Sequence, residues 1–188
     1  MRIMFVGDIN LGEYYTGFGH GPKSYLSKNS VFNDVKGLFL GADFVVGNLE
    51  APIANSEGDL SDPESQVLRC SADAVQELKN SGFKVVQVAN NHIVQHGSDV
   101  FEETISLLGE KEILAVGRKG GRQVLEKDGL KVAFYAASDV PDNTDKKQNK
   151  YQCLNKEFIS KIEKEIDDFD HVVVMLHWGL EESPTPLP

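Results

Sequence analysis

The sequence predicts an α/β protein built on a largely parallel sheet. Short apolar runs that end in glycine or polar residues alternate with runs whose apolar residues recur at helical spacing. This alternation is typical of parallel strands joined by helices. One exception is an Asp-Gly pair, Asp128-Gly129, between two strand-like runs, which predicts a single inserted hairpin. A chain of 188 residues suits one domain with a substantial buried core.

Strands are expected where short apolar, β-branched runs lie between turn residues. The first begins almost at once in the chain, and Pro52 prevents a simple continuation of the second. The expected strands are 2–7, 43–47, 67–70, 84–89, 113–116, 122–126, 130–136 and 171–176.

Helices are expected from apolar spacing combined with start and stop signals. The first is a short, mainly apolar run over residues 31–40, and a later one places Phe101 and Leu108 on one face. Polar caps and glycine stops bound these runs. The expected N-caps are Ser71, Ser98 and Asn155, and the expected stops are Gly41, Gly82 and Gly109.

Two polar or glycine-rich stretches are expected to be loops. Residues 9–30 are punctuated by glycine and Pro22, and long ordered loops are often functional. Their ring-bearing side chains could contact a ligand, although packing of the loop is the favoured interpretation. Those side chains are Tyr14, Tyr15, Phe18 and His20. Residues 138–154 are expected to form an exposed loop, and 183–188 a Pro-rich tail after a domain spanning 1–182.

Composition limits the classes of function. The formal net charge of −10 argues against a nucleic-acid partner, because an acidic surface repels phosphates. Cys70 and Cys153 lack CxxC spacing; they could pair with each other, but free, buried thiols are the favoured interpretation. No run is long enough to span a bilayer and no signal peptide is visible. The chain as it stands is therefore expected to be cytoplasmic, and membrane-associated or extracytoplasmic if an N-terminal anchor was removed.

Polar, metal-capable side chains follow four of the expected strands. In open α/β sheets, ligands bind beyond the carboxyl ends of the strands, so these side chains are expected to converge. The residues concerned are Asp8, Asn10, Asn48, Glu50, Asn90, Asn91, His92, His177 and Glu181. Each strand end alone is weak evidence, because turns, helix-entry loops and buried histidines often carry such residues, but four in one chain favour a shared site. Carboxylate, amide and imidazole groups bind Mn²⁺, Fe²⁺ or Zn²⁺.

The same four strand ends carry motifs of a known family. Phe5-Val-Gly-Asp8, Gly47-Asn-Leu-Glu50, Ala89-Asn-Asn-His92 and His177-Trp-Gly-Leu-Glu181 resemble the CapA family of bacterial capsule and poly-γ-glutamate synthesis proteins. The resemblance runs through the whole chain. That family is similar to the calcineurin-like metallophosphoesterases, so the resemblance implies a four-layer α/β/β/α sandwich with mixed, partly parallel sheets.

The resemblance also implies roles for individual residues. His92 matches the histidine that protonates the leaving group, while Asn48 and Glu181 are assigned to substrate binding. Asn10 stands where the phosphoesterases usually have a histidine ligand, and Glu50 where they have the bridging aspartate. The implied ligands, for one or two divalent ions, are Asp8, Asn10, Glu50, Asn91 and His177. We expect Asp8, Glu50, Asn91 and His177 to lie within several ångströms of one another.

Two departures from the family pattern affect this expectation. Many members have aspartate three residues after the Asn-Asn-His histidine, where this chain has Gln95, and glutamine orients a histidine less well than a carboxylate does. The family also continues to a Gly-His-His-Pro-His segment that completes the metal centre. This chain ends at Pro188, so we expect the domain to be incomplete at its C-terminus.

Three functions agree with these observations. The first is metal-dependent hydrolysis or transfer at a phosphoester or an amide. The second is a non-catalytic component of capsule or poly-γ-glutamate synthesis that binds the anionic polymer or synthase subunits. The third is an inactive fragment of the domain.

Overall fold

The computed structural model describes residues 1–13, 21–26, 30–59, 61–142 and 149–179, which form two stacked sheets. The first sheet has the order β1-β2-β5-β6, and all of its pairings are parallel. The second has the order β7-β8-β9, with β7 antiparallel and β9 parallel to β8. The strands of the two sheets are β1 (Ile3–Ile9), β2 (Phe44–Leu49), β5 (Phe83–Gln87), β6 (Leu114–Val116), β7 (Gln123–Lys127), β8 (Leu130–Ser138) and β9 (His171–His177).

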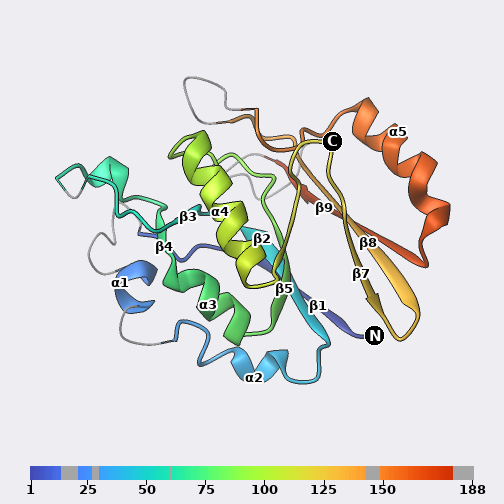
Figure 1. The fold of residues 1–188 in the computed structure, drawn as a ribbon, viewed down its shortest axis with the longest axis horizontal. Helices are drawn as coiled ribbons and strands as arrows, with labels where there is room; N and C mark the ends of the chain where they lie inside the picture. Colours follow the sequence, from blue (N-terminus) through green and yellow to red (C-terminus); the bar gives the residue numbers. More distant parts are fainter. Residues whose placement is uncertain (14–20, 27–29, 60, 143–148, 180–188) are drawn as a thin grey trace.

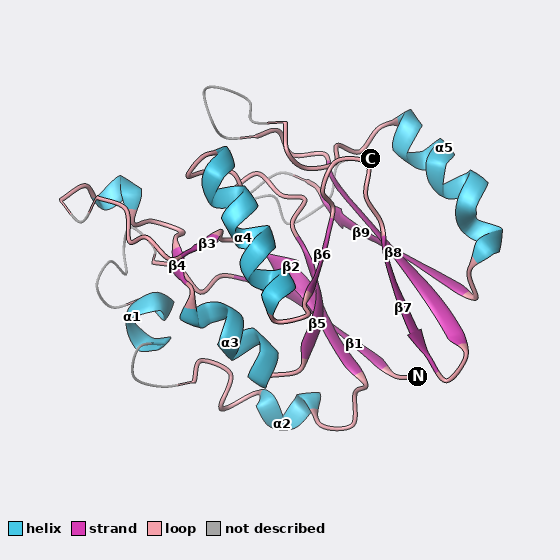
Figure 2. Cartoon of the chain, in the orientation of Figure 1, coloured by secondary structure: helices cyan, strands magenta, loops and turns pink. Residues whose placement is uncertain are grey.

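Helices cover the outer face of each sheet, which gives four layers (Figures 1 and 2). α3 and α4 lie on the first sheet, and α5 lies on the second. A two-stranded sheet of β3 (Ile53–Ala54) and β4 (Cys70–Ser71) packs beside α4. The helices are α1 (Pro22–Leu26), α2 (Lys36–Phe39), α3 (Asp73–Asn80), α4 (Ser98–Glu110) and α5 (Lys156–Glu165), with 3₁₀ turns η2 (Pro63–Ser65) and η3 (Ile166–Asp168).

Two apolar clusters hold these layers together. The larger joins the facing sides of both sheets with α3 and α4, and it includes Val86, Phe134 and the fully buried Phe101. The smaller lies between the second sheet and α5, where Tyr135 packs against Phe158. Burial of these side chains is the main driving force for the sandwich.

The structure confirms the alternating pattern but shifts several boundaries. Strand β1 continues through Asp8 to Ile9, so Asp8 is part of a strand rather than of a turn. The helix expected over 31–40 is shorter than predicted: turns precede it, only α2 is helical, and none of the α2 side chains is buried. Within the loop expected over 9–30, residues 22–26 form α1, whereas Tyr14, Tyr15, Phe18 and His20 lie outside the described residues.

The expected helix caps had mixed outcomes. Asn155 caps α5 as predicted, since its Oδ1 accepts from Phe158 N at 2.9 Å. Ser71 does not cap α3, because Ala72 occupies the cap position without a side-chain hydrogen bond. Ser98 is the first residue of α4 and follows a Gly97 cap.

The loop over 138–154 and the cysteines also differ in part from expectation. Tyr151 is buried and forms a bridge with Arg118, so the described part of this loop is not wholly exposed. Both cysteines are free, as expected, but Cys153 is exposed and only Cys70 is buried. In the described part of the chain, no helix has the length and apolarity needed to cross a membrane.

Candidate metal centre

Adjacent parallel strands deliver the polar residues to one place. Asp8 on β1 lies directly beside Asn48 on β2, just after an irregularity in the β1–β2 register. Glu50 follows the last residue of β2, and Asn91 and His92 follow β5. From the second sheet, β9 ends on His177. The site therefore lies at the carboxyl ends of strands from both sheets, as the sequence predicted.

The structure brings the four residues expected to converge close to one another. One carboxylate oxygen each from Asp8 and Glu50 and one imidazole nitrogen of His177 lie within 4.8 Å of one another. The fourth, Asn91, is buried, and its Oδ1 is 3.0 Å from His177 Nε2. Two carboxylates, an amide oxygen and an imidazole match the ligand chemistry of Mn²⁺, Fe²⁺ and Zn²⁺, so the residues present fit a divalent cation.

His92 lies beside this group and is oriented by Gln95. Its Nε2 is 3.9 Å from Glu50 Oε1, while its Nδ1 is 2.9 Å from Gln95 Oε1. Gln95 therefore supplies an oxygen to the imidazole where many family members have a carboxylate. An amide oxygen carries no full charge, so it is expected to orient the histidine less firmly than aspartate would.

An open cleft of about 690 Å³ gives access to these groups. Besides the predicted residues, four further side chains line it: Asp139, Val140, Pro141 and Trp178. Asp139 directly follows β8, so it carries the same signal as the others, a polar residue after an apolar strand. Trp178 is 61% exposed at the rim, next to His177.

The electrostatics of the cleft also favour a cation. Burial raises the pKa of the Glu50 carboxyl, and the nearby Asp8 carboxylate raises it further, while His177, His92 and a hydrogen bond from Asn48 oppose the shift. Ionisation of such a carboxylate is costly without a cation and becomes favourable once a cation neutralises the charge.

Asn48 lies behind the carboxylates rather than in the cleft. It is buried, and its Nδ2 donates to Asp8 Oδ1 at 2.8 Å and to Glu50 Oε2 at 2.6 Å. Its predicted role in substrate binding stays a prediction, because the cleft is lined by other described residues. Glu181, the other predicted substrate contact, lies outside the described residues.

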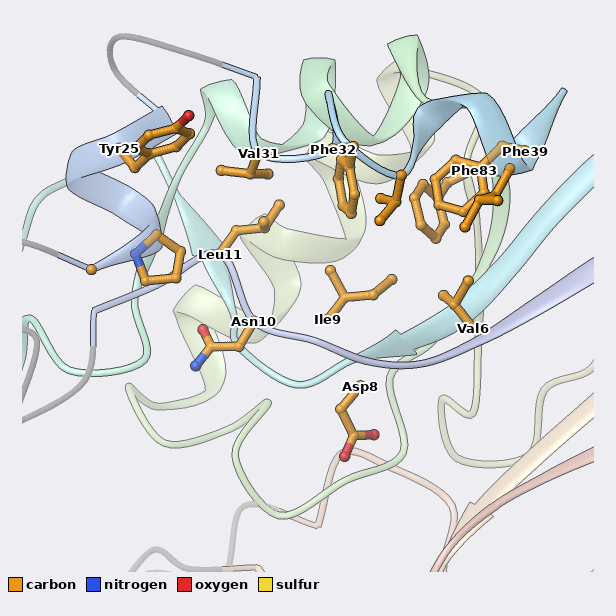
Figure 3. Close-up of a pocket in the computed structure, with 14 residues that line it drawn as sticks. Val6, Asp8, Ile9, Asn10, Leu11, Tyr25, Val31, Phe32, Phe39 and Phe83 are labelled. Carbon is orange, nitrogen blue, oxygen red and sulfur yellow. The ribbon is translucent and has the colours of Figure 1, made fainter.

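Asn10 does not join the cleft either. Its Oδ1 accepts from Gly12 N at 2.8 Å, and its Nδ2 is buried with no hydrogen-bond partner among the described residues. It lines a separate, mostly apolar pocket of about 650 Å³ between β1 and the α1–α2 segment, and Phe32 and Phe39 also line this pocket (Figure 3). Asp8 borders both cavities but points away from the aromatic side chains of this pocket. The ligand role predicted for Asn10 therefore stays a prediction.

Comparison with solved structures defines the class of fold. A putative 5′-nucleotidase from Staphylococcus aureus, in complex with α-ketoglutarate, superposes with a TM-score of 0.56 at 16% identity, covering 98% of this chain and 39% of that one. A phosphatase from Mycoplasma pneumoniae superposes with a TM-score of 0.51 at 17% identity, covering 94% and 55%. The fold is that of the calcineurin-like phosphoesterases, which confirms the four-layer sandwich implied by the resemblance.

The sequence assigns the family. The model of the bacterial capsule synthesis protein PGA_cap matches residues 2–188, and the chain belongs to this family. The PGA biosynthesis protein CapA of Bacillus subtilis (strain 168) is 26% identical over 193 residues, 97% of this chain and 50% of that protein. The capsule biosynthesis protein CapA of Bacillus anthracis is 26% identical over 207 residues, 100% and 49% respectively. The chain thus spans about half the length of these relatives.

Proposed function

We propose that this protein acts in capsule or poly-γ-glutamate synthesis through metal-dependent hydrolysis or transfer at a phosphoester or an amide. The observation that carries the proposal is the donor group of Asp8, Glu50 and His177, whose ligand atoms lie within 4.8 Å of one another in an open cleft. Membership of the capsule synthesis family supplies the biological setting. The substrate would be an anionic polymer or a small phosphoester or amide, with synthase subunits as further partners.

The residues divide into ligands and a proton donor. Asp8, Glu50, Asn91 and His177 would hold the ion. A bound divalent ion supplies an activated water and polarises the group under attack. His92 has its Nδ1 held by Gln95 and its Nε2 toward Glu50 Oε1 at the cleft, an orientation suited to protonating a leaving group.

A non-catalytic role in binding the polymer or the synthase is the second candidate. It is favoured by Asn10, which replaces a usual histidine ligand and does not line the cleft. In this case the cation would serve to hold an anionic polymer rather than to activate water. Retained polymer synthesis in cells that carry Asp8→Ala or His92→Ala would support this second candidate.

Metal analysis and hydrolysis assays test the first candidate. The purified protein should bind Mn²⁺ or Zn²⁺ and hydrolyse a chromogenic phosphodiester or a γ-glutamyl amide. Asp8→Ala should abolish both binding and turnover. His92→Ala should leave the ion bound and lower turnover about 10²–10⁴-fold, the usual contribution of a general acid. Turnover that is unchanged in both variants would contradict a catalytic role.

A further inference from the structure

The Asn48 amide nitrogen lies among the candidate ligands. It is 2.8 Å from Asp8 Oδ1, 2.6 Å from Glu50 Oε2 and 3.5 Å from His177 Nδ1. An amide NH₂ has two protons to donate, and the two short contacts use both of them. One buried side chain thus joins the two carboxylates of the group.

Asn90 determines which way this amide faces. Asn90 Oδ1 accepts from Ile93 N at 2.9 Å, and its Nδ2 donates to Leu49 O at 2.8 Å, so two backbone groups fix its own orientation. The same Nδ2 lies 3.1 Å from Asn48 Oδ1 and donates to it. If Asn48 were flipped, two NH₂ groups would face each other, and two carboxylates would face an amide oxygen. Asn48 therefore presents donors to Asp8 and Glu50.

We propose that Asn48 is a positioning residue for the cation site: held by Asn90, it directs the Asp8 and Glu50 carboxylates toward the ion without binding the ion itself. Asn48 donates to Glu50 Oε2, so the other carboxylate oxygen, Oε1, faces the two imidazoles. It lies 3.9 Å from Nε2 of both His92 and His177. The inference rests on the proposed function for the ion. The hydrogen bonds from Asn90 to Asn48 and from Asn48 to the two carboxylates do not depend on that function.

The hydrogen bonds that Asn48 donates have a second effect in the cation-free protein. Two neighbouring carboxylates repel each other, and Asn48 offsets this repulsion by donating one proton to each. Asn48→Ala removes both the hydrogen bonds that orient the two carboxylates and the donated protons that offset their repulsion. Asn48→Asp keeps the shape and still accepts from Asn90, but it replaces two donors with a third negative charge.

Calorimetric titration with Mn²⁺ tests the positioning role. Asn48→Ala should weaken Mn²⁺ binding about 10–100-fold, the usual cost of losing a group that orients a ligand. Asn55→Ala is the matched control, because Asn55 Nδ2 also donates to a carboxylate, Glu103 Oε1 at 2.8 Å, on an exposed part of the surface. Its Mn²⁺ affinity should be unchanged. An Asn48→Ala affinity within about threefold of wild type would overturn the proposal.

Asn48→Asp keeps the test decisive if Asn48→Ala does not fold. In EDTA its Tm should fall below that of wild type, and adding Glu50→Gln should restore part of the loss, since one of three adjacent carboxylates is removed. Saturating Mn²⁺ should raise the Tm of Asn48→Asp by more than it raises that of wild type. An equal or smaller rise would count against Asn48 as the group that offsets the repulsion between the Asp8 and Glu50 carboxylates.

The two proposals fail in different ways. If wild type does not bind Mn²⁺, the metal-dependent function fails, while the EDTA measurements still decide whether Asn48 compensates the carboxylates. If wild type binds Mn²⁺ but Asn48→Ala binds it equally well, the positioning role fails and the function stands.

Discussion

Glu50→Gln should make the cation-free protein more stable and the cation-loaded protein less so. Glutamine has the same shape and can still accept from Asn48, but it removes one of two adjacent negative charges. At the 4.8 Å that bounds the donor group, two unit charges repel by about 3.5 kcal/mol at an effective dielectric constant of about 20. Asp8 is exposed, so solvent screening reduces the expected gain to roughly 1–2 kcal/mol.

The stability gained by Glu50→Gln in the cation-free protein should depend on pH in a defined direction. Burial and Asp8 raise the pKa of Glu50 in the folded state above its ordinary value of 4.5. The folded protein therefore holds this proton more tightly than the unfolded chain does, and stability is lost as the pH rises above the unfolded-state value and through the folded-state pKa. Wild type in EDTA should lose this stability between acidic and neutral pH, and Glu50→Gln should not.

Thermal unfolding in EDTA and in Mn²⁺ measures both effects. A gain of roughly 1–2 kcal/mol corresponds to about 2–8 °C in Tm for a chain of this size. With Mn²⁺ at about 100 times its Kd, wild type should gain about 2.7 kcal/mol, and the variant much less, so their order of stability should reverse. Glu126→Gln, at an exposed position of β7, is the control. A Glu50→Gln variant that is less stable in EDTA would contradict repulsion between Glu50 and Asp8, and one that gains as much stability from Mn²⁺ as wild type would contradict Glu50 as a ligand.

Three further predictions concern other parts of the molecule. Gln95→Asp should change the rate of any turnover, because a carboxylate against His92 Nδ1 orients the imidazole more firmly than an amide oxygen does; an unchanged rate would argue that His92 takes no part. Burial raises the pKa of Cys70 to about 12, so a thiol reagent at pH 8 should modify the exposed Cys153 in the folded protein and reach Cys70 only after denaturation. Phe101→Ala should cost about 3–5 kcal/mol in urea unfolding, because Phe101 is fully buried; a loss below about 1 kcal/mol would show that α4 is not packed as described.

The strand ends were predictable because the signal is local. An apolar run followed by a polar residue identifies Asp8, Asn91 and His177, and the parallel arrangement makes those ends meet. Asp139 follows β8 in the same way and lines the cleft. It was missed because residues 138–154 were interpreted as an exposed loop. Boundaries were less certain, as in the short α2, where apolar composition indicated a longer helix than tertiary packing supports.

The role of Asn48 could not be predicted from the sequence. Its amide orientation depends on Asn90, which is 42 residues away in the sequence, and on the backbone groups that fix Asn90. The position of Asn10 also needed the structure, because spacing from Asp8 alone does not show that its Oδ1 is engaged by Gly12 N. Sequence patterns place residues at strand ends, whereas hydrogen bonds between distant segments decide whether an amide turns its oxygen or its NH₂ group toward the site.

The most direct test of the metal centre is anomalous diffraction at the manganese edge from crystals grown with Mn²⁺. We expect an ion in contact with Asp8, Glu50, Asn91 and His177, with Asn48 Nδ2 still bonded to both carboxylates on the far side. An ion held elsewhere, or no ion at a Mn²⁺ concentration well above the Kd measured in solution, would contradict this expectation.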